Sequence, residues 1–269
     1  RVRIDVDRSD FWGNVCSMPV ATHLLNIACN FPVDRLLGNL NHMFDAKTRR
    51  DAERLYSDDV RMNRRLRELL RFQPFPFAGQ ALTSAQLLSP HYFEDQNMRV
   101  ADFASNRVAA WQSVAAGNLR LLHEDVAALM ATSRPHARLH VYAGTHGVAS
   151  LRPAEGEGPR AELFLGAERR FPVPRYIWTV VHAPELGRAA AIVLLNDPFV
   201  AVSEVRAAVF CDSVCSRLAY LASLRRHRAF ECPLYGLVFC CDVAGLAAQA
   251  PELPPGLFSN PNVNVLNSN

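Results

Sequence analysis

The chain of 269 residues has little lysine, no long apolar run and no glycine-rich phosphate loop. Because no run of about 18 consecutive apolar residues occurs, no segment is predicted to cross a membrane. Hydrophobic residues make up 49% and charged residues 20%, which excludes a disordered chain or a coiled coil. These values predict a globular protein with a sizeable core.

The positive charge is carried almost entirely by arginine, since Lys47 is the only lysine. The net charge of +3 is too small to predict nucleic-acid binding by itself. Two explanations for the arginine excess stay open. One is bidentate contacts between arginine and carboxylates of neighbouring molecules, and the other is codon bias, because alanine, leucine and proline are also abundant.

Common catalytic and metal-binding motifs are absent from the sequence, including G-x-G-x-x-G, G-x-S-x-G and H-E-x-x-H. Nine histidines are present. His91 precedes Glu94 and Asp95, which are placed to orient it, and His123 is followed by two acidic residues. For any one of these histidines alone, a surface or hydrogen-bonded structural role is the simpler interpretation. We therefore predict no metal site.

Seven cysteines are present, and their spacing predicts disulfide bonds. Cys16 and Cys29 are expected to pair with each other. Cys211 and Cys215 are expected on one face of a helix, and Cys240 and Cys241 on opposite faces of a strand. Two bridges between helix and strand then require an irregular strand end. Disulfides indicate an oxidising compartment, and the odd count leaves one thiol free or joined to another chain.

Hydrophobic patterning predicts a mixed α+β fold, with a central, mainly antiparallel sheet flanked by helices. We expect helices over residues 50–72, 100–132 and 202–225, the last holding Cys211 and Cys215. Strands are expected over 138–144, 161–166, 175–183, 189–196 and 235–243. No repeat or long linker divides the chain, so one domain is expected, with an N-terminal extension (1–40), a core (40–258) and a polar tail (259–269).

Several segments, in this order, resemble one family. They are LLSP (87–90), AAWQSVAAGN (109–118), VYAGTHGVASL (141–151), VPRYIWTVV (173–181) and LLNDP (194–198). They are similar to motifs of the DNA/RNA non-specific endonucleases of the ββα-metal fold, in the secreted arthropod-type branch. The cysteine-bearing segments CDSVC and YGLVFCCDV resemble the C-terminal part of that family. The resemblance covers residues 40–258.

The resemblance implies a catalytic plan. A histidine activates water, and one magnesium, held by an asparagine and by water, polarises the phosphate. Arginines offset the charge of the transition state, and a glutamate orders metal-bound water. The same resemblance implies the ββα-metal nuclease fold, with Mg²⁺ as cofactor only where the site is intact.

The sequence departs from the family at each catalytic position. The arginine, glycine and histidine of the signature fall on Ala85, Gln86 and Leu87. The metal-binding asparagine falls on Ala115, and the glutamate and a following arginine fall on His123 and Ala127. Asn106, at a supporting position, and Asn118 are retained. Leucine accepts no proton and alanine binds no magnesium, so the resemblance implies an inactive member.

Three hypotheses for function follow. The first is a pseudonuclease with a structural, self-assembling role, as in a virion, coat, crystal or extracellular matrix. The second is nucleic-acid binding without cleavage, through Arg99, Arg107 and Arg134. The third is an active metal-dependent nuclease in which His91, His123, Glu124 or Asp125 replaces a lost group. We rank the first slightly above the second, and both above the third. A secreted or otherwise oxidising location is expected, with self-association, and no membrane partner.

Overall fold

The computed structural model describes residues 46–69, 80–93, 98, 101–133, 139–151, 160–226, 230–251 and 253. In this part the chain is α+β, with antiparallel strand pairing throughout. The expected N-terminal extension, the Cys16–Cys29 pair and the polar tail lie outside these residues, as do Arg99 and Arg134. No helix in the described ranges is long and apolar enough to cross a membrane.

The main sheet has four strands in the order β3-β6-β7-β8. Their bounds are β3 His140–Val148, β6 Pro174–Ala183, β7 Arg188–Leu195 and β8 Val238–Cys241. The sequence predicts all four, and the short turn at Gly187 joins β6 to β7 as a hairpin. Of the expected strand over 161–166, only β5 Ala161–Glu162 forms, paired with β4 Ser150–Leu151.

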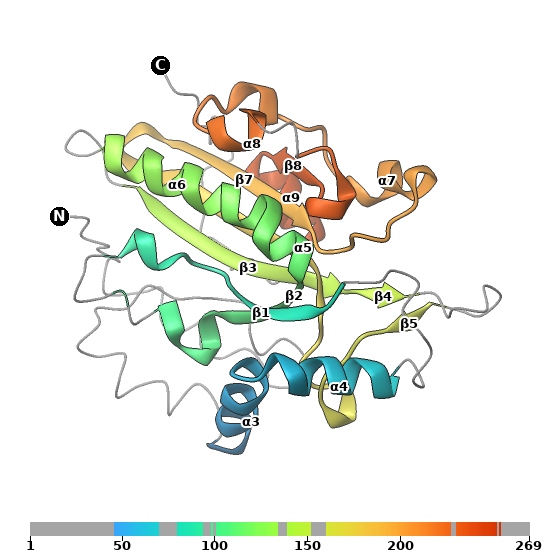
Figure 1. Cartoon of the computed structure of the whole chain (residues 1–269). Coiled ribbons are helices and arrows are strands. Elements are labelled where there is room, and N and C mark those ends of the chain that lie inside the picture. The colour runs from blue at the N-terminus through green and yellow to red at the C-terminus, as the bar shows by residue number, and fades with distance from the viewer. Residues whose placement is uncertain are drawn as a thin grey trace.

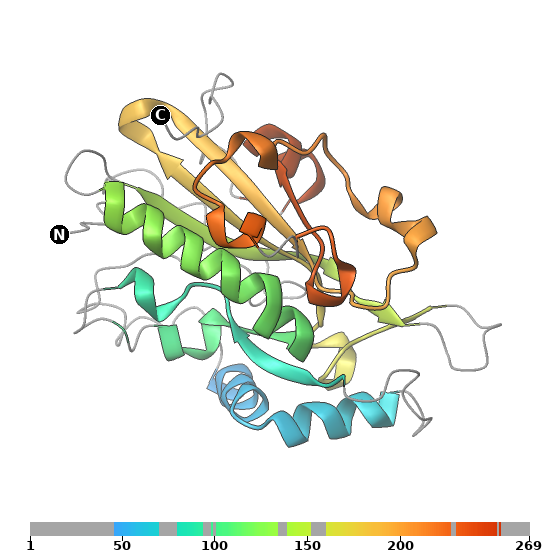
Figure 2. The same ribbon diagram turned by 45° about the horizontal axis from the view of Figure 1, so that its top comes forward.

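Alternate residues of the two central strands enter two separate cores. Ile177, Ile192 and Leu194 face one core, and Trp178 and Val193 face the other. Because both faces are covered, β6 and β7 are apolar without a polar side. Helix α6 Arg120–Ser133 crosses one face (Figures 1 and 2). The short helices α7 Val202–Ala208 and α9 Val243–Gln249 pack on the other.

A second, two-stranded sheet lies beside the first. It pairs β1 Leu82–Gln86 with β2 Arg107–Trp111, and the short helix α5 Gln112–Val114 follows directly. A π turn, Ala115–Leu119, joins α5 to α6. The expectation of helix over 100–132 is therefore wrong for residues 107–111. Those residues pair with β1, and the Trp111 amide donates to Asn196 Oδ1 at 3.0 Å instead of to a helical carbonyl.

The predicted helix over 50–72 is two helices, α3 Ala46–Tyr56 and α4 Asp59–Leu69. Asp58 Oδ1 accepts a hydrogen bond from the Arg61 amide at 3.0 Å, three residues further on. An aspartate in that position caps the start of a helix, which ends α3 and begins α4.

The prediction of one helix over 202–225 is wrong, although the predicted cysteines do pair. Helix α7 ends at Ala208, and α8 Ala222–Arg226 is separate. The bridges are Cys211–Cys241 and Cys215–Cys240. Cys240 belongs to one core and Cys241 to the other, so their partners must reach opposite faces of the sheet. Two cysteines on one face of a helix could not form both disulfides. The chain from Cys211 to Cys215 instead passes around the edge of β8.

The segment from Cys211 to Cys215 also covers the free edge of strand β8. β8 pairs with β7 on one side only. On its other side the Val214 amide donates to the Cys240 carbonyl at 2.8 Å, and the Cys240 amide donates to Ser213 Oγ at 3.3 Å. Unpaired strand edges invite pairing with other chains. The two disulfides therefore hold a cap on this edge, and they are typical of an oxidising environment.

We predict that a non-reduced digest of the native protein contains one species in which the peptide bearing Cys240 and Cys241 is linked to both Cys211 and Cys215, and that its fragmentation in the mass spectrometer gives Cys211–Cys241 and Cys215–Cys240 products. Replacing either pair by alanine is expected to lower the free energy of unfolding by about 3 kcal/mol, because each bridge closes a loop of 30 or 25 residues. Chemical denaturation measures this loss. Recovery of a Cys211–Cys240 or a Cys211–Cys215 peptide contradicts the arrangement around β8.

Candidate functional site

The candidate site lies where the end of β1 meets the helix that follows β2. Chain order here is strand, strand, helix, and β1 and β2 run antiparallel, with Leu82 opposite Trp111 and Gln86 opposite Arg107. This places Ala85, Gln86 and Leu87 at the end of one strand, where the Leu87 carbonyl contacts His123 of α6. The sequence-predicted positions Ala85, Leu87, Ala115 and Ala127 all lie in one apolar cluster or pack against it.

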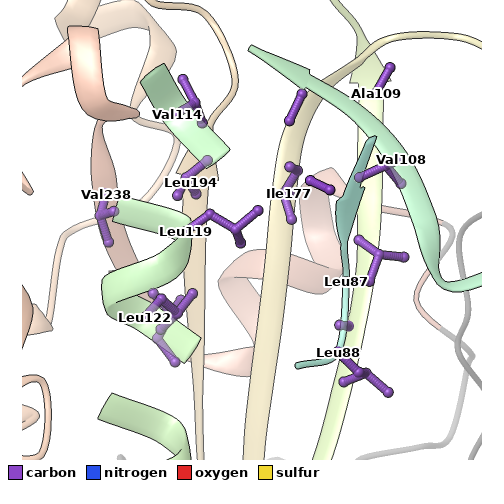
Figure 3. Packing of buried hydrophobic residues seen from close by; sticks show 14 of the residues in the cluster. Leu87, Leu88, Val108, Ala109, Val114, Leu119, Leu122, Ile177, Leu194 and Val238 are labelled. Carbon is purple, nitrogen blue, oxygen red and sulfur yellow. The ribbon is translucent and has the colours of Figure 1, made fainter. Parts of the chain in front are cut away.

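Leu87 is completely buried in that cluster. Its amide donates to the Asn106 carbonyl at 2.9 Å. Figure 3 shows Leu87 and Leu88 in one apolar layer with Leu119 and Leu122 of the helical segment and with Ile177 of the main sheet. An apolar side chain without solvent contact cannot take up a proton or activate a water molecule.

The side chain of Asn106 holds the backbone next to Leu87 through three hydrogen bonds. Its Oδ1 accepts a hydrogen bond from the Leu88 amide at 2.9 Å. Its Nδ2 donates to the Leu88 carbonyl and to the Ala101 carbonyl, both at 2.9 Å. Asn106 is buried, and these three bonds use both hydrogens of its amide nitrogen and one lone pair of its oxygen. Its role in the described structure is to hold two backbone segments together.

His123 reaches the backbone of Leu87, directly after the end of β1. Its Nε2 lies 3.3 Å from the Leu87 carbonyl oxygen, and its ring packs edge-on against Tyr92, with ring centres 5.7 Å apart. Burial is the main cause that lowers the pKa of His123 to about 4, and the nearby His91 lowers it further, while the bond to Leu87 opposes the shift. The imidazole is therefore neutral near pH 7, and its Nε2 donates to the Leu87 carbonyl.

The other side chains that were expected to replace a lost catalytic group make contacts elsewhere or lie at the surface. Glu124 is exposed and forms an ion pair with Arg120 on the same helix. Asp125 is buried and accepts hydrogen bonds from the amides of Ser223, at 2.7 Å, and Leu224, at 3.1 Å. Asp125 thus caps the start of α8, a role that its position beside His123 in the sequence did not reveal. His91 is exposed at the surface, and Glu94 and Asp95 lie outside the described residues.

Arg107, a predicted nucleic-acid contact, is paired within the chain. Its Nη2 lies 2.7 Å from Asp102 Oδ1, and its side chain is 25% exposed. Gln86 joins the same cluster, because its Nε2 donates to the Asp102 carboxylate at 3.2 Å and to the Ala101 carbonyl at 3.1 Å. The charge of this arginine is largely offset by its own neighbour.

The residues at this site do not fit a magnesium ion. Magnesium prefers oxygen ligands, of which carboxylates are the strongest in proteins, and Leu87 and Ala115 offer none. Across the ranges that the structure covers, no group of three or more histidine, cysteine, aspartate or glutamate side chains converges. The donors nearest in sequence, Glu124 and Asp125, are turned to an arginine and to a helix cap.

A residue that sequence patterning did not single out, Asn196, joins the two sheets. It is fully buried after β7, and its Nδ2 donates to the carbonyls of Ala109, at 3.2 Å, and Pro174, at 2.9 Å. Its Oδ1 accepts from the Trp111 amide. Position 196 lies in the LLNDP segment, so only the family resemblance marked it.

Comparison of the sequence with known protein families found no family model that matches it. Comparison with curated proteins found no similar sequence either.

The part-buried His123 predicts a loss of stability in acid. In the folded protein its pKa is about 4, against 6.5 for a free imidazole, so folding favours the neutral form. Above pH 6.5 the imidazole is neutral in both states and costs no stability. As the pH falls from 6.5 toward 4, the free energy of unfolding decreases by at most about 3 kcal/mol. Compared with the wild type, His123→Gln should lose less stability between these two pH values.

Urea denaturation at a series of pH values measures this difference. His91→Gln removes the nearby charge that also lowers the pKa of His123, so it should reduce the acid-dependent loss only in part, and less than His123→Gln does. Equal pH dependence of the wild type and His123→Gln would show that the imidazole of His123 is not held neutral by the fold.

Proposed function

We propose that the chain is a catalytically inactive relative of the DNA/RNA non-specific endonucleases of the ββα-metal fold, with a structural, self-assembling role. The observation that carries the proposal is the burial of Leu87. It stands where the resemblance places the general base, at the end of β1 and beside α6. The strand-strand-helix order of β1, β2 and the following helix supports the same assignment.

Two independent losses support inactivity. A general base contributes about a 100- to 10,000-fold rate increase, and leucine supplies none of it. The resemblance places the metal-binding asparagine on Ala115, which packs against the apolar cluster. A site without a base and without a metal ligand keeps neither the activated water nor the charge stabilisation that phosphodiester hydrolysis needs.

The contacts in this region give less support to an active site with rearranged catalytic groups than to an inactive site. His123 would have to serve as the base, but its pKa of about 4 makes it a poor proton acceptor at neutral pH. Glu124 and Asp125 are held by Arg120 and by the start of α8. Any activity would also need magnesium ligands that these side chains do not provide.

We expect the purified protein to release no acid-soluble nucleotides from DNA or RNA above the blank, with Mg²⁺ or Mn²⁺. The expected rate is at least about a thousandfold below that of an active metal-dependent nuclease assayed alongside. Hydrolysis that chelator abolishes, and that co-purifies with the protein, contradicts the proposal. His123→Gln then tests whether the imidazole of His123 is responsible.

The self-assembling role is supported by the surface around Cys232. This thiol is half-buried and pairs with no described cysteine. Two and three residues further on, Leu234 and Tyr235 are 43% and 44% exposed. Exposed apolar side chains beside an unpaired thiol suit a contact with a second copy, sealed by a disulfide in an oxidising compartment.

We therefore expect the native protein to sediment as a species larger than the monomer. A non-reducing gel should show a disulfide-linked dimer that Cys232→Ser removes, while Leu234→Ser with Tyr235→Ser weakens assembly in reducing buffer. Analytical ultracentrifugation and paired gels measure both effects. A monomer under both reducing and oxidising conditions contradicts the self-assembling role and leaves the inactive-nuclease assignment to be judged by the hydrolysis assay.

A further inference from the structure

A group of arginines that form no ion pair with any described residue covers the outer face of α3 and α4. Arg50, Arg54, Arg64 and Arg67 are all exposed. They lie on the sides of their helices away from the buried residues Ala52, Leu55, Met62 and Leu66. Arg50 and Arg54 are one turn apart, which is about 6 Å along the helix axis. We call these four residues the arginine face.

The acidic residues of the two helices are already engaged. Residues 46–68 include eight basic and five acidic side chains. Four of the acids pair with arginines outside the arginine face: Asp51 with Arg170, Glu53 with Arg49, Asp58 with Arg61 and Glu68 with Arg65. The fifth, Asp59, accepts hydrogen bonds from Thr83 Oγ1 at 2.8 Å and from the Ser84 amide at 3.2 Å.

No acidic side chain of the described residues therefore offsets the charge of the arginine face. Within the part of the chain that the structure covers, none of its four members forms an ion pair, and Arg67 donates only to the Asn63 carbonyl of its own helix. Arg107, by contrast, is bound to Asp102. Figures 1 and 2 place α3 and α4 together at one end of the molecule, on the far side of the β1–β2 pair from α6.

The surface lacks what a membrane contact needs. Helices that lie on a bilayer insert an apolar face into it. The apolar residues of α3 and α4 are turned inward, and Val60 is the one large hydrophobic side chain exposed on their described part. Guanidinium groups without an apolar neighbour suit a hydrated polyanion, and a row of phosphates offers each of them a bidentate partner.

We infer that the arginine face of α3 and α4 binds the phosphate backbone of nucleic acid, without reading its sequence. This contact is separate from the end of β1 and from the predicted groove arginines Arg99, Arg107 and Arg134. It does not depend on self-assembly or on the loss of catalysis. It assigns the nucleic-acid contact of this chain to a surface that needs no residue of the former catalytic site.

The test compares two triple variants of equal charge. Arg50→Ala/Arg54→Ala/Arg64→Ala removes three members of the arginine face. Arg206→Ala/Arg217→Ala/Arg226→Ala removes three exposed arginines from α7, α8 and the turn between them. All six side chains are at the surface, so both variants should fold, which circular dichroism and thermal melting verify.

Binding of a labelled DNA duplex is measured by fluorescence anisotropy between about 50 and 200 mM salt. For the first variant we expect the affinity at low salt to fall on the order of tenfold, and the slope of log affinity against log salt to fall by about 3, close to one per lost phosphate contact. The control variant should keep the wild-type slope. Arg50→Lys/Arg54→Lys/Arg64→Lys should restore most of it, because the charge returns.

Three results would each overturn the inference. The first is no duplex binding by the wild type at low salt. The second is an equal loss in the two triple variants, which assigns binding to net charge and not to this face. The third is wild-type binding to phosphatidylserine vesicles or to polyglutamate that depends on the arginine face, while duplex binding does not. That outcome would identify a lipid or an acidic protein as the partner that binds the arginine face.

Discussion

The proposed function depends on the complete burial of Leu87 where strand β1 meets helix α6. Its side chain has no exposed surface, its amide is bound to Asn106, and its carbonyl receives His123. Strand β1, the segment before β2 and helix α6 therefore meet around an apolar residue. Restoring a solvated, proton-accepting group there would require moving a side chain out of the apolar cluster that also holds Leu119, Leu122 and Ile177, labelled in Figure 3.

The polar residues around this point have taken structural roles. Asn106 ties Leu88 to Ala101, Asp125 caps α8, and Asn196 joins β2 to the main sheet. Each is buried and hydrogen-bonded, as buried polar groups must be if they are not to destabilise the fold. In this region the buried polar side chains hold backbone segments in place. Exposed arginines that pair with no described acidic residue lie on the outer face of α3 and α4.

Much of the sheet was predictable, because the apolar runs of β3, β6, β7 and β8 are long and bounded by turns. The errors have specific causes. Val108 and Trp111 fit a helical spacing as well as a strand, and only pairing with β1 decides between them. The spacing of Cys211 and Cys215 fits a helix, but partners on opposite faces of β8 exclude it. At the candidate site, Leu87 and Ala115 were singled out by the resemblance alone, and their assignment to a nuclease site stays a proposal. The engagement of Arg107 by Asp102 depends on tertiary contacts that spacing does not encode.

The central claim, that no divalent ion is held where β1 meets α6, is tested most directly by crystals grown or soaked in Mn²⁺. Manganese takes the oxygen ligands that magnesium takes, and its anomalous scattering locates it without ambiguity. The account predicts no anomalous peak within bonding distance of any side chain among Leu87, Asn106, Ala115 and His123. A peak ligated there by the amide of Asn106 and the imidazole of His123 would contradict it, and would return the site to the class of active metal-dependent nucleases.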